Sequence, residues 1–328
     1  MPAAGRLWLR AGRPRSPFSN RIGARVPLDR SAERGLAAAC GDATEFIVTA
    51  SRLTRSPQRS HGLASMSAKP RRIVLKFGSG ILASARGNSL DRRQFKRLTD
   101  DVAALVKAGH EVAVVSSGAV AAGLGALGLK QRPEELAARQ ACAAIGQSKL
   151  MQLYSTLFEA HGLNVAQLLL THGDLDSRAR HANARNTLER LFDRRTVVPI
   201  INENDSVAVE ELKFGDNDRL SAEVAMLARA DLLVLLTSVD GLLDESGRTV
   251  PVVDDIDGVA SLARQEKGKF SVGGMISKLQ AVKLAMDAGI PTYIASGRKA
   301  GQIAAVVAGR RAGTRFVARG EESTKGTK

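Results

Sequence analysis

The fold of this chain is decided by the stretch Val197-Val198-Pro199-Ile200-Ile201-Asn202-Glu203-Asn204-Asp205-Ser206-Val207. It begins as an apolar, β-branched run, which predicts a buried strand. Four polar residues, Asn202 to Asp205, follow at once, and we interpret them as a cluster too polar for the core. At the carboxyl end of a buried parallel strand, such a cluster lies where open α/β sheets bind their ligands.

A second polar cluster, Gly215-Asp216-Asn217-Asp218, comes shortly afterwards and precedes a helix that we expect to begin near Leu220. Asn and Asp side chains often cap a helix, which is the simplest interpretation of this cluster. Two dense Asn/Asp clusters so close together exceed what one cap needs. We therefore favour a binding role for both clusters.

Segments typical of strands alternate with segments typical of helices around this stretch. The predicted strands cover residues 72–77, 111–115, 165–170, 197–201, 231–237 and 291–295, and the predicted helices cover 91–109, 134–160, 181–193, 275–288 and a segment from about 220. This alternation predicts an α/β protein in which a mostly parallel central sheet is covered on both faces, a three-layer αβα sandwich. We assign residues 70–318 to one domain and 319–328 to a flexible tail.

The composition limits the class of protein. Hydrophobic residues make up 44% of the 328 residues but aromatic residues only 4%, so the core must be aliphatic. No apolar run is long enough to span a bilayer, and we expect no membrane partner. The two cysteines, Cys40 and Cys142, have neither metal nor disulfide spacing, which favours a reducing compartment and a cytoplasmic location.

The formal charge of +15 suggests nucleic-acid binding, but its distribution argues against it. Residues 1–65 carry eleven Arg, no Lys and four acidic residues, so nearly half of the excess lies in a fifth of the chain. The remainder is mildly basic, as suits a protein that handles anions. We expect no nucleic-acid partner; binding through residues 1–65 is the alternative, and it predicts a salt-dependent affinity.

Residues 1–65 form an Arg-rich extension that we exclude from the fold. An Arg-rich, Ser-rich and acid-poor segment is typical of an organelle transit peptide. The other explanation is a mis-called start, with translation beginning at Met66. The acidic residues and the apolar Phe46-Ile47-Val48 dilute the transit pattern and favour the second explanation. In either case we expect this extension to be disordered.

Three of the predicted strands end in loops of small residues, Gly78-Ser79-Gly80, Ser116-Ser117-Gly118 and Ser296-Gly297. Glycine lets backbone N–H groups approach a ligand, and three such loops at one sheet edge suggest a cradle for phosphate or carboxylate. The run from Gly123 to Gly128 matches the dinucleotide fingerprint literally, but it does not directly follow a strand, so we reject it. No GxxxxGK[ST] run exists, which excludes a P-loop enzyme.

Two lysines are candidates for binding phosphate. Lys76 lies inside an apolar strand, where an unpaired ammonium group would be costly, although a lysine at a sheet edge can snorkel to water. Lys278 follows the glycine pair Gly273-Gly274 at the start of a helix, although alone it would resemble an ordinary surface lysine. The five histidines show neither metal spacing nor a catalytic arrangement.

Five motifs between residues 72 and 318 resemble those of the amino acid kinase family, and they follow one another in the same order as in that family. They are Lys76-Phe77-Gly78-Ser79-Gly80, Ser116-Ser117-Gly118-Ala119-Val120, Ile201-Asn202-Glu203-Asn204-Asp205-Ser206-Val207, Phe214-Gly215-Asp216-Asn217-Asp218 and Gly273-Gly274-Met275-Ile276-Ser277-Lys278. Within that family, the Asn-Glu-Asn-Asp and Gly-Asp-Asn-Asp pair is similar to that of members that act on free glutamate.

The resemblance implies an enzyme that transfers the γ-phosphoryl group of ATP to the side-chain carboxylate of L-glutamate. The product would be L-glutamyl 5-phosphate, formed in the first step of proline biosynthesis. Lys76 and Lys278 would hold the phosphates, and Asp218 would orient both lysines. The resemblance assigns glutamate binding to Ser117, Asp205 and Asn217, and ATP binding to Lys76, Thr237, Ser238, Gly273, Gly274 and Lys278.

Elementary chemistry agrees with these roles. Phosphoryl transfer needs positioning and charge neutralisation, and a carboxylate acceptor is already ionised at pH 7, so no general base is required. Mg²⁺ is implied with ATP, and we assign it no protein ligand because it prefers water and phosphate oxygens. The chain departs from the family at Thr237-Ser238, where Thr-Asp is usual, and we expect no C-terminal PUA domain of the kind that many members carry.

Several expectations and alternatives remain open. The family implies a homo-oligomer, feedback inhibition by proline and an association with glutamyl phosphate reductase. The chief alternative is a sister kinase that acts on acetylglutamate, aspartate, carbamate or a nucleotide monophosphate. Asp205 argues against it, because its carboxylate suits a free α-ammonium group. A ligand-binding regulator that lost the chemistry is the non-enzyme alternative, and the presence of both lysines and Asp218 argues against that.

Overall fold

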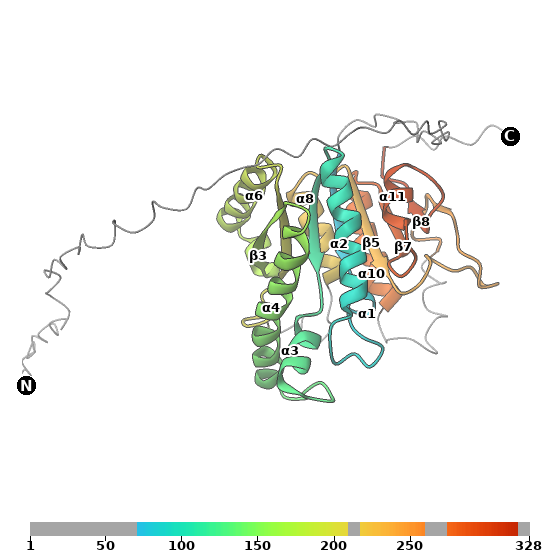
Figure 1. Ribbon diagram of the computed structural model, residues 1–328. Helices are drawn as coiled ribbons and strands as arrows, with labels where there is room; N and C mark the ends of the chain where they lie inside the picture. Colours follow the sequence, from blue (N-terminus) through green and yellow to red (C-terminus); the bar gives the residue numbers. More distant parts are fainter. Residues whose placement is uncertain (1–70, 209–216, 260–273, 321–328) are drawn as a thin grey trace, which may run out of the picture. The chain divides into compact units, whose positions relative to one another are not determined.

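The computed structural model describes residues 71–208, 217–259 and 274–320, all of which lie in the compact unit Ser65–Lys328 (Figure 1). The predicted extension over residues 1–65 lies outside the described residues. The same holds for the predicted tail beyond Gly320 and for the motif residues of the gaps at 209–216 and 260–273.

Eight strands of the described chain form one sheet in the order β3-β4-β2-β1-β5-β7-β8-β6. The strands are β1 (Arg72–Phe77), β2 (Glu111–Ser116), β3 (Asn164–Leu170), β4 (Val197–Glu203), β5 (Leu232–Thr237), β6 (Val252–Val253), β7 (Thr292–Ser296) and β8 (Thr314–Phe316). All neighbouring pairs are parallel except β7 with β8. The carboxyl ends of β2, β1, β5 and β7 therefore meet at one edge, as the three small-residue loops require.

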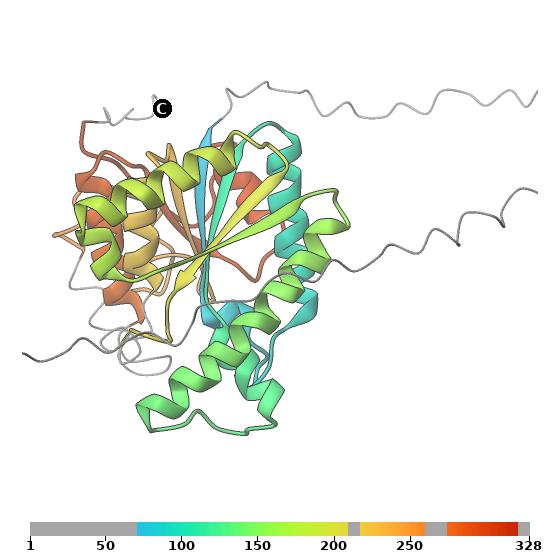
Figure 2. The same cartoon turned by 90° about the vertical axis from the view of Figure 1, so that its left-hand side faces the viewer.

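Helices cover both faces of the sheet (Figure 2). They are α1 (Ser79–Leu82), α2 (Arg92–Lys107), α3 (Ala119–Leu127), α4 (Leu136–Glu159), α5 (His172–Asp176), α6 (Arg178–Phe192), α8 (Asn217–Leu227), α10 (Gly274–Asp287) and α11 (Gln302–Val307). One core lies between the sheet and α1, α2, α4 and α11, and a second lies between the sheet and α6, α8 and α10. The expectation of a purely aliphatic core was wrong, because the largest fully buried side chains are Tyr154, Phe77, Phe95, Phe158 and Phe316. The predicted three-layer αβα sandwich is confirmed.

Strand β1 shows how the sheet positions a polar side chain. Its residues alternate between faces, so that Ile73, Leu75 and Phe77 enter the core under α2 while Val74 enters the core under α8 and α10. Lys76 shares the face of Val74, because side chains two residues apart point the same way. The ammonium group is thereby directed to the layer that holds α8 and α10.

The helices α3 and α4 cross unusually closely and project past the edge of the sheet where β1 ends (Figures 1 and 2). A Cβ added at Gly146 of α4 would lie 1.7 Å from the carbonyl oxygen of Ala119, so only glycine fits at this crossing. The facing residue on α3 is Gly123, whose added Cβ would lie 1.9 Å from the Cys142 carbonyl oxygen. The fingerprint-like glycine run thus serves helix packing and does not follow a strand.

The polar stretch after Ile201 is more deeply buried than the sequence predicts. Asn202 and Glu203 are buried, with 2% and 6% of their surface exposed, and they complete strand β4. The interpretation of the whole cluster as too polar for the core was therefore wrong for these two residues. Asn202 is accommodated because its amide hydrogen-bonds on both sides, to Gln147 and to Asn217. Asn204 and Asp205 are half-buried, as a site residue can be.

Candidate active site

One buried carboxylate joins two lysines that are 202 positions apart in the sequence. Lys76 extends from β1 and donates a short hydrogen bond to Oδ1 of Asp218, in the first turn of α8. Lys278 extends from α10, and its Nζ lies 3.0 Å from Oδ2 of the same residue. Only 2% of the Asp218 side chain, 6% of Lys76 and 14% of Lys278 are exposed. The two ammonium groups therefore converge at one partly open point.

The electrostatics of this cluster keep its carboxylate ionised. Burial alone would raise the pKa of Asp218, but the charges of Lys76 and Lys278 and their hydrogen bonds outweigh it and hold the pKa of Asp218 well below its usual range. Its place in the first turn of α8 also favours a negative charge, because the amino end of a helix carries partial positive charge. Asp218 thus offsets one of two positive charges and leaves the cluster cationic.

Short contacts fix the geometry of this cluster. Ser277 donates to Oδ2 of Asp218 over 3.1 Å, and Lys278 donates also to the Gly274 carbonyl oxygen over 2.8 Å. On the other side, the Ser221 hydroxyl donates to the Asp218 carbonyl oxygen over 2.5 Å. The start of α10 is thereby tied to the start of α8.

A second set of contacts joins the end of β2 to the same helix. Nδ2 of Asn217 donates to the Ser116 carbonyl oxygen, to Oγ of Ser117 over 3.2 Å and to Oδ1 of Asn202 over 2.8 Å. Nδ2 of Asn202 in turn donates to Oε1 of Gln147 on α4 over 2.8 Å. Two predicted substrate residues, Ser117 and Asn217, are therefore in contact, one residue away from Asp218.

Asp205 lies in the wall of a small cavity of about 220 Å³ beside this network. The cavity is enclosed by α4, by β3 and by the turn after β4, and is lined by Ala143, Ala144, Gln147, Ser148, Gln167, Leu169, Glu203, Asn204, Asp205 and Ser206. Gln147 connects the cavity to Asn217 through Asn202. Two carboxylates, Glu203 and Asp205, line it and no basic side chain does, which suits a cationic group.

The residues predicted to line a nucleotide site are only partly described. Thr237 ends β5, and its carbonyl oxygen accepts a 2.8 Å hydrogen bond from the backbone N–H of Gly297. Ser238 follows and is exposed, whereas Gly274 is half-buried and contacts Lys278. Gly273 lies outside the described residues. The structure thus places Thr237 at the same sheet edge as Lys76, since β5 pairs with β1 in parallel.

The sequence-based assignment missed three residues that contact the site. They are Ser277, which contacts Asp218, and the pair Asn202 and Gln147, which extends the contacts of Asn217. Ser277 directly precedes Lys278, and its position in the glycine-rich helix start was a usable signal. Asn202 stood in the quoted polar stretch but was treated only as part of a cluster. Gln147 carried no signal, because a polar residue in an Ala-rich helix is ordinary and only the fold brings it to Asn202.

The described side chains of the Asp218 cluster suit an anionic ligand. In residues 71–208, 217–259 and 274–320, no group of three or more His, Cys, Asp or Glu side chains could hold a metal ion. The two converging ammonium groups suit phosphate oxygens. Among these same residues, no helix is long and apolar enough to cross a membrane.

Comparisons with known proteins agree with this geometry. The model of the family described as "Amino acid kinase family" matches residues 71–296. Glutamate 5-kinase from Moorella thermoacetica is 46% identical over 259 residues, which cover 77% of this chain and 68% of that protein. Glutamate 5-kinase from Thermus thermophilus is also 46% identical, over 77% of this chain and 69% of its own length.

Solved structures show the same fold at low sequence identity. Carbamate kinase from Giardia lamblia, bound to AMP-PNP, superposes with a TM-score of 0.54 at 18% identity, over 77% of this chain and all of that chain. UMP kinase from Bacillus anthracis superposes with a TM-score of 0.51 at 16% identity, over 76% of this chain and 98% of that chain. Taken with the family match and the 46% identical relatives, these findings show that the chain belongs to the amino acid kinase family.

Proposed function

We propose that this chain is a glutamate 5-kinase, which transfers the γ-phosphoryl group of ATP to the side-chain carboxylate of L-glutamate. The observation that carries the proposal is the cluster in which Asp218 holds the ammonium groups of Lys76 and Lys278. Two neighbouring ammonium groups suit this reaction, because the phosphoryl donor, ATP, and the phosphoryl acceptor, the glutamate carboxylate, are both anions. The product, L-glutamyl 5-phosphate, is the first intermediate of proline biosynthesis.

The relatives favour glutamate over the substrates of the sister kinases. Relatives that share 44–46% of aligned residues with this chain, over about three quarters of it, are named glutamate 5-kinase. The carbamate and UMP kinases share only 16–18% and support the fold alone. A sister activity on acetylglutamate, aspartate, carbamate or a nucleotide monophosphate is therefore retained only as an outcome of the test below.

The proposed mechanism needs no covalent intermediate on the protein. An oxygen of the glutamate side chain attacks the γ-phosphorus, a new P–O bond forms, and the bond to the oxygen that bridges the β- and γ-phosphates breaks to release ADP. The attacking carboxylate is ionised at neutral pH, so no side chain has to remove a proton. Lys76 and Lys278 offset charge on the transferring group and on the leaving oxygen. Asp218 positions both lysines.

Glutamate would be held by groups at the ends of β2 and β4. The Ser117 hydroxyl accepts from Asn217, so its own hydrogen remains to donate to a carboxylate of the substrate. Asn217 would fix Ser117 and contact the substrate beside it. Asp205 would bind the α-ammonium group from the wall of the acidic cavity.

ATP would lie over the ends of β1, β5 and β7. Thr237 and Ser238 would line the nucleotide site, and Gly273 and Gly274 would approach the phosphates closely. Mg²⁺, when bound with ATP, would supply further charge neutralisation through phosphate oxygens and water, since it needs few protein ligands. Ser238 stands where the family usually has Asp, so we expect one nucleotide contact to differ.

The purified full chain tests the proposal directly. With ATP, Mg²⁺ and hydroxylamine, we expect an acyl hydroxamate to form from L-glutamate, because hydroxylamine traps acyl phosphates. Parallel reactions contain acetylglutamate, aspartate, carbamate or UMP, with ADP release as a common readout. If one of these compounds supported ADP release and glutamate did not, the enzyme would be assigned to that compound and the proposal of a glutamate 5-kinase would be wrong.

The assembly, regulation and location of the enzyme are predictions that rest on the family. We propose a homo-oligomer, feedback inhibition by proline and an association with glutamyl phosphate reductase, in the cytoplasm. Light scattering of the purified chain checks the first. Titration of proline into the hydroxamate assay checks the second, because inhibition competitive with glutamate is expected if proline, a similar small zwitterion, enters the same cavity.

A further inference from the structure

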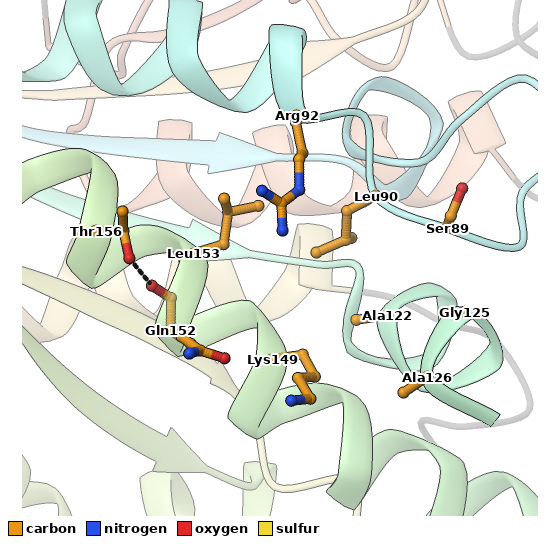
Figure 3. A pocket seen from close by; sticks show the side chains of 10 residues that line it. All are labelled: Ser89, Leu90, Arg92, Ala122, Gly125, Ala126, Lys149, Gln152, Leu153 and Thr156. Carbon is orange, nitrogen blue, oxygen red and sulfur yellow. Dashed lines mark hydrogen bonds between the residues drawn. The ribbon is translucent and has the colours of Figure 1, made fainter.

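A second cavity, of about 440 Å³, lies among α2, α3 and α4 (Figure 3). Asp218 belongs to α8, which packs on the opposite face of the sheet from α2 and α4. It is bounded by α3, α4, the start of α2 and the loop before α2, and it is open to solvent, since six of its ten lining residues are exposed. Its walls are formed by Ser89, Leu90, Arg92, Ala122, Gly125, Ala126, Lys149, Gln152, Leu153 and Thr156. None of these residues belongs to the catalytic, substrate or nucleotide groups assigned above, so this cavity has no role in the proposed reaction.

The cavity is cationic. Arg92 and Lys149 line it, and its walls contain no Asp or Glu. Figure 3 shows Arg92 extending from the start of α2 towards α4, the helix that carries Lys149. Within the described part of the chain, neither side chain forms an ion pair or a hydrogen bond, whereas Arg72 pairs with Glu111 and Glu189. Two cations thus face one space without a carboxylate between them.

The start of α2 adds to this positive potential. Arg92 is the first residue of a sixteen-residue helix, whose amino end carries partial positive charge. The N-cap residue Asp91 does not line the cavity, and its carboxylate accepts a hydrogen bond from the backbone N–H of Gln94 over 3.1 Å. A negative group between Arg92 and Lys149 would therefore meet two side-chain charges and a helix end.

The remaining walls combine apolar residues with the polar residues Ser89, Gln152 and Thr156. Leu90 and Leu153 lie on either side of Arg92 in Figure 3, and Ala122 and Ala126 of α3 close the cavity opposite. The hydroxyl groups at the rim are already engaged, that of Ser89 with Ser84 and that of Thr156 with the Gln152 carbonyl oxygen. Its size falls in the range of small-molecule sites, and its chemistry suits a ligand that is charged at one end and apolar at the other.

We propose that this cavity is a second binding site, for a small organic dianion such as a phosphate monoester with an apolar body. Its charged group lies between the guanidinium of Arg92 and the ammonium of Lys149, and its apolar part packs on Leu90 and Leu153. Charge-assisted hydrogen bonds to Arg and Lys are the strong polar contacts available there. The ligand would bridge α2 and α4, which supply the two cations.

Isothermal titration calorimetry of the full chain with phenyl phosphate tests the proposal. Saturating ADP, Mg²⁺ and L-glutamate are present, so that phosphate binding at the nucleotide site does not contribute. We expect one site with a Kd of about 1 mM or tighter at low salt. Arg92→Gln and Lys149→Gln should each weaken binding about tenfold or more, as expected for the loss of a charged hydrogen-bond partner.

Two controls separate the site from general charge effects. Arg93→Gln removes an exposed charge next to Arg92 but does not alter the cavity wall, so it should leave the Kd within about twofold. Benzyl alcohol, which has the ring without the charge, should not bind measurably. A thermal shift caused by phenyl phosphate in the parent should vanish in the Arg92→Gln, Lys149→Gln double variant.

The proposal is overturned by any of three results. These are the absence of phenyl phosphate binding at about 10 mM, an unchanged Kd in the double variant, and an equal loss of affinity in Arg93→Gln. Circular dichroism of each variant checks that the substitutions leave the fold intact, as their exposed side chains lead us to expect.

Discussion

Replacing Asp218 by Asn tests the central feature of the site. The substitution keeps the shape of the side chain and removes its charge, so Lys76 and Lys278 lose the carboxylate that both now contact. Asn can accept from one lysine through its oxygen but presents NH₂ to the other. We expect the two ammonium groups to separate, and the charge around the transferring phosphoryl group to be misplaced.

The size of the effect follows from burial and distance. At 3.0 Å and an effective dielectric constant of about 20, Lys278 and Asp218 attract each other by about 5.5 kcal/mol before desolvation is subtracted. Removing one partner of a buried ion pair typically costs about 3–5 kcal/mol. If a similar amount is lost from the transition state, kcat/KM falls by about 10² to 10⁴. The free energy of unfolding should fall by a few kcal/mol as well.

The assay is ATP- and glutamate-dependent hydroxamate formation, with urea unfolding measured on the same preparations. Ser277→Ala is the matched control, because Ser277 donates to the same Asp218 oxygen over 3.1 Å but carries no charge. It should cost about 1 kcal/mol, or less than about tenfold in rate. A folded Asp218→Asn enzyme with kcat/KM within about threefold of the parent would refute the role given to this carboxylate.

Three further predictions use other parts of the structure. Lys278→Met should lower kcat at least about 10²-fold in the hydroxamate assay, whereas Lys283→Met, which removes an exposed lysine from the same helix, should change it less than about twofold. Gly146→Ala should lower the free energy of unfolding by at least about 2 kcal/mol in urea titrations, because its Cβ would collide with a backbone carbonyl of α3. The hydrogen bond to Glu223 raises the pKa of His172 above its ordinary value, despite burial. Its stabilisation is therefore present below about pH 6.5 and is lost as the pH rises through the raised pKa, so His172→Gln should destabilise more at about pH 5.5 than at about pH 8.5.

The long elements of the fold were predictable because each carries its own periodic signal. Strand β1 and helix α2 lie within a residue or two of the predicted bounds, since apolar spacing and the cap at Asp91 mark them locally. The short elements α11 and β8 were missed. A six-residue helix and a three-residue strand offer too few positions for a periodic pattern, and their structure depends on neighbours elsewhere in the chain.

The contact of Asp218 with both lysines was predicted and is present in the structure, whereas the contacts of Asn202 were not predicted. Lys76 was conspicuous because a lysine in an apolar strand requires a partner, and the structure supplies Asp218. The burial of Asn202 was not predictable, since it depends on Gln147 and Asn217, which come from two other elements. Local sequence shows that a polar group needs a partner, whereas only the fold shows which residue provides it.

The topology explains how residues so distant in sequence form one site. Strand β1 lies at the centre of the sheet between β2 and β5, so Lys76 reaches the edge where the six parallel strands β3, β4, β2, β1, β5 and β7 end. Helices α8 and α10 pack against one another on the face to which Lys76 points, and each presents its amino end at that edge. Asp218 gains from the positive helix end, whereas Lys278 does not, and its ammonium group instead contacts the Gly274 carbonyl oxygen and Asp218. Lys76 and Lys278 thus place two positive charges beside helix starts that favour anions, and Asp218 supplies a carboxylate between them. In the proposed reaction, the phosphates of ATP would add further negative charge at this point.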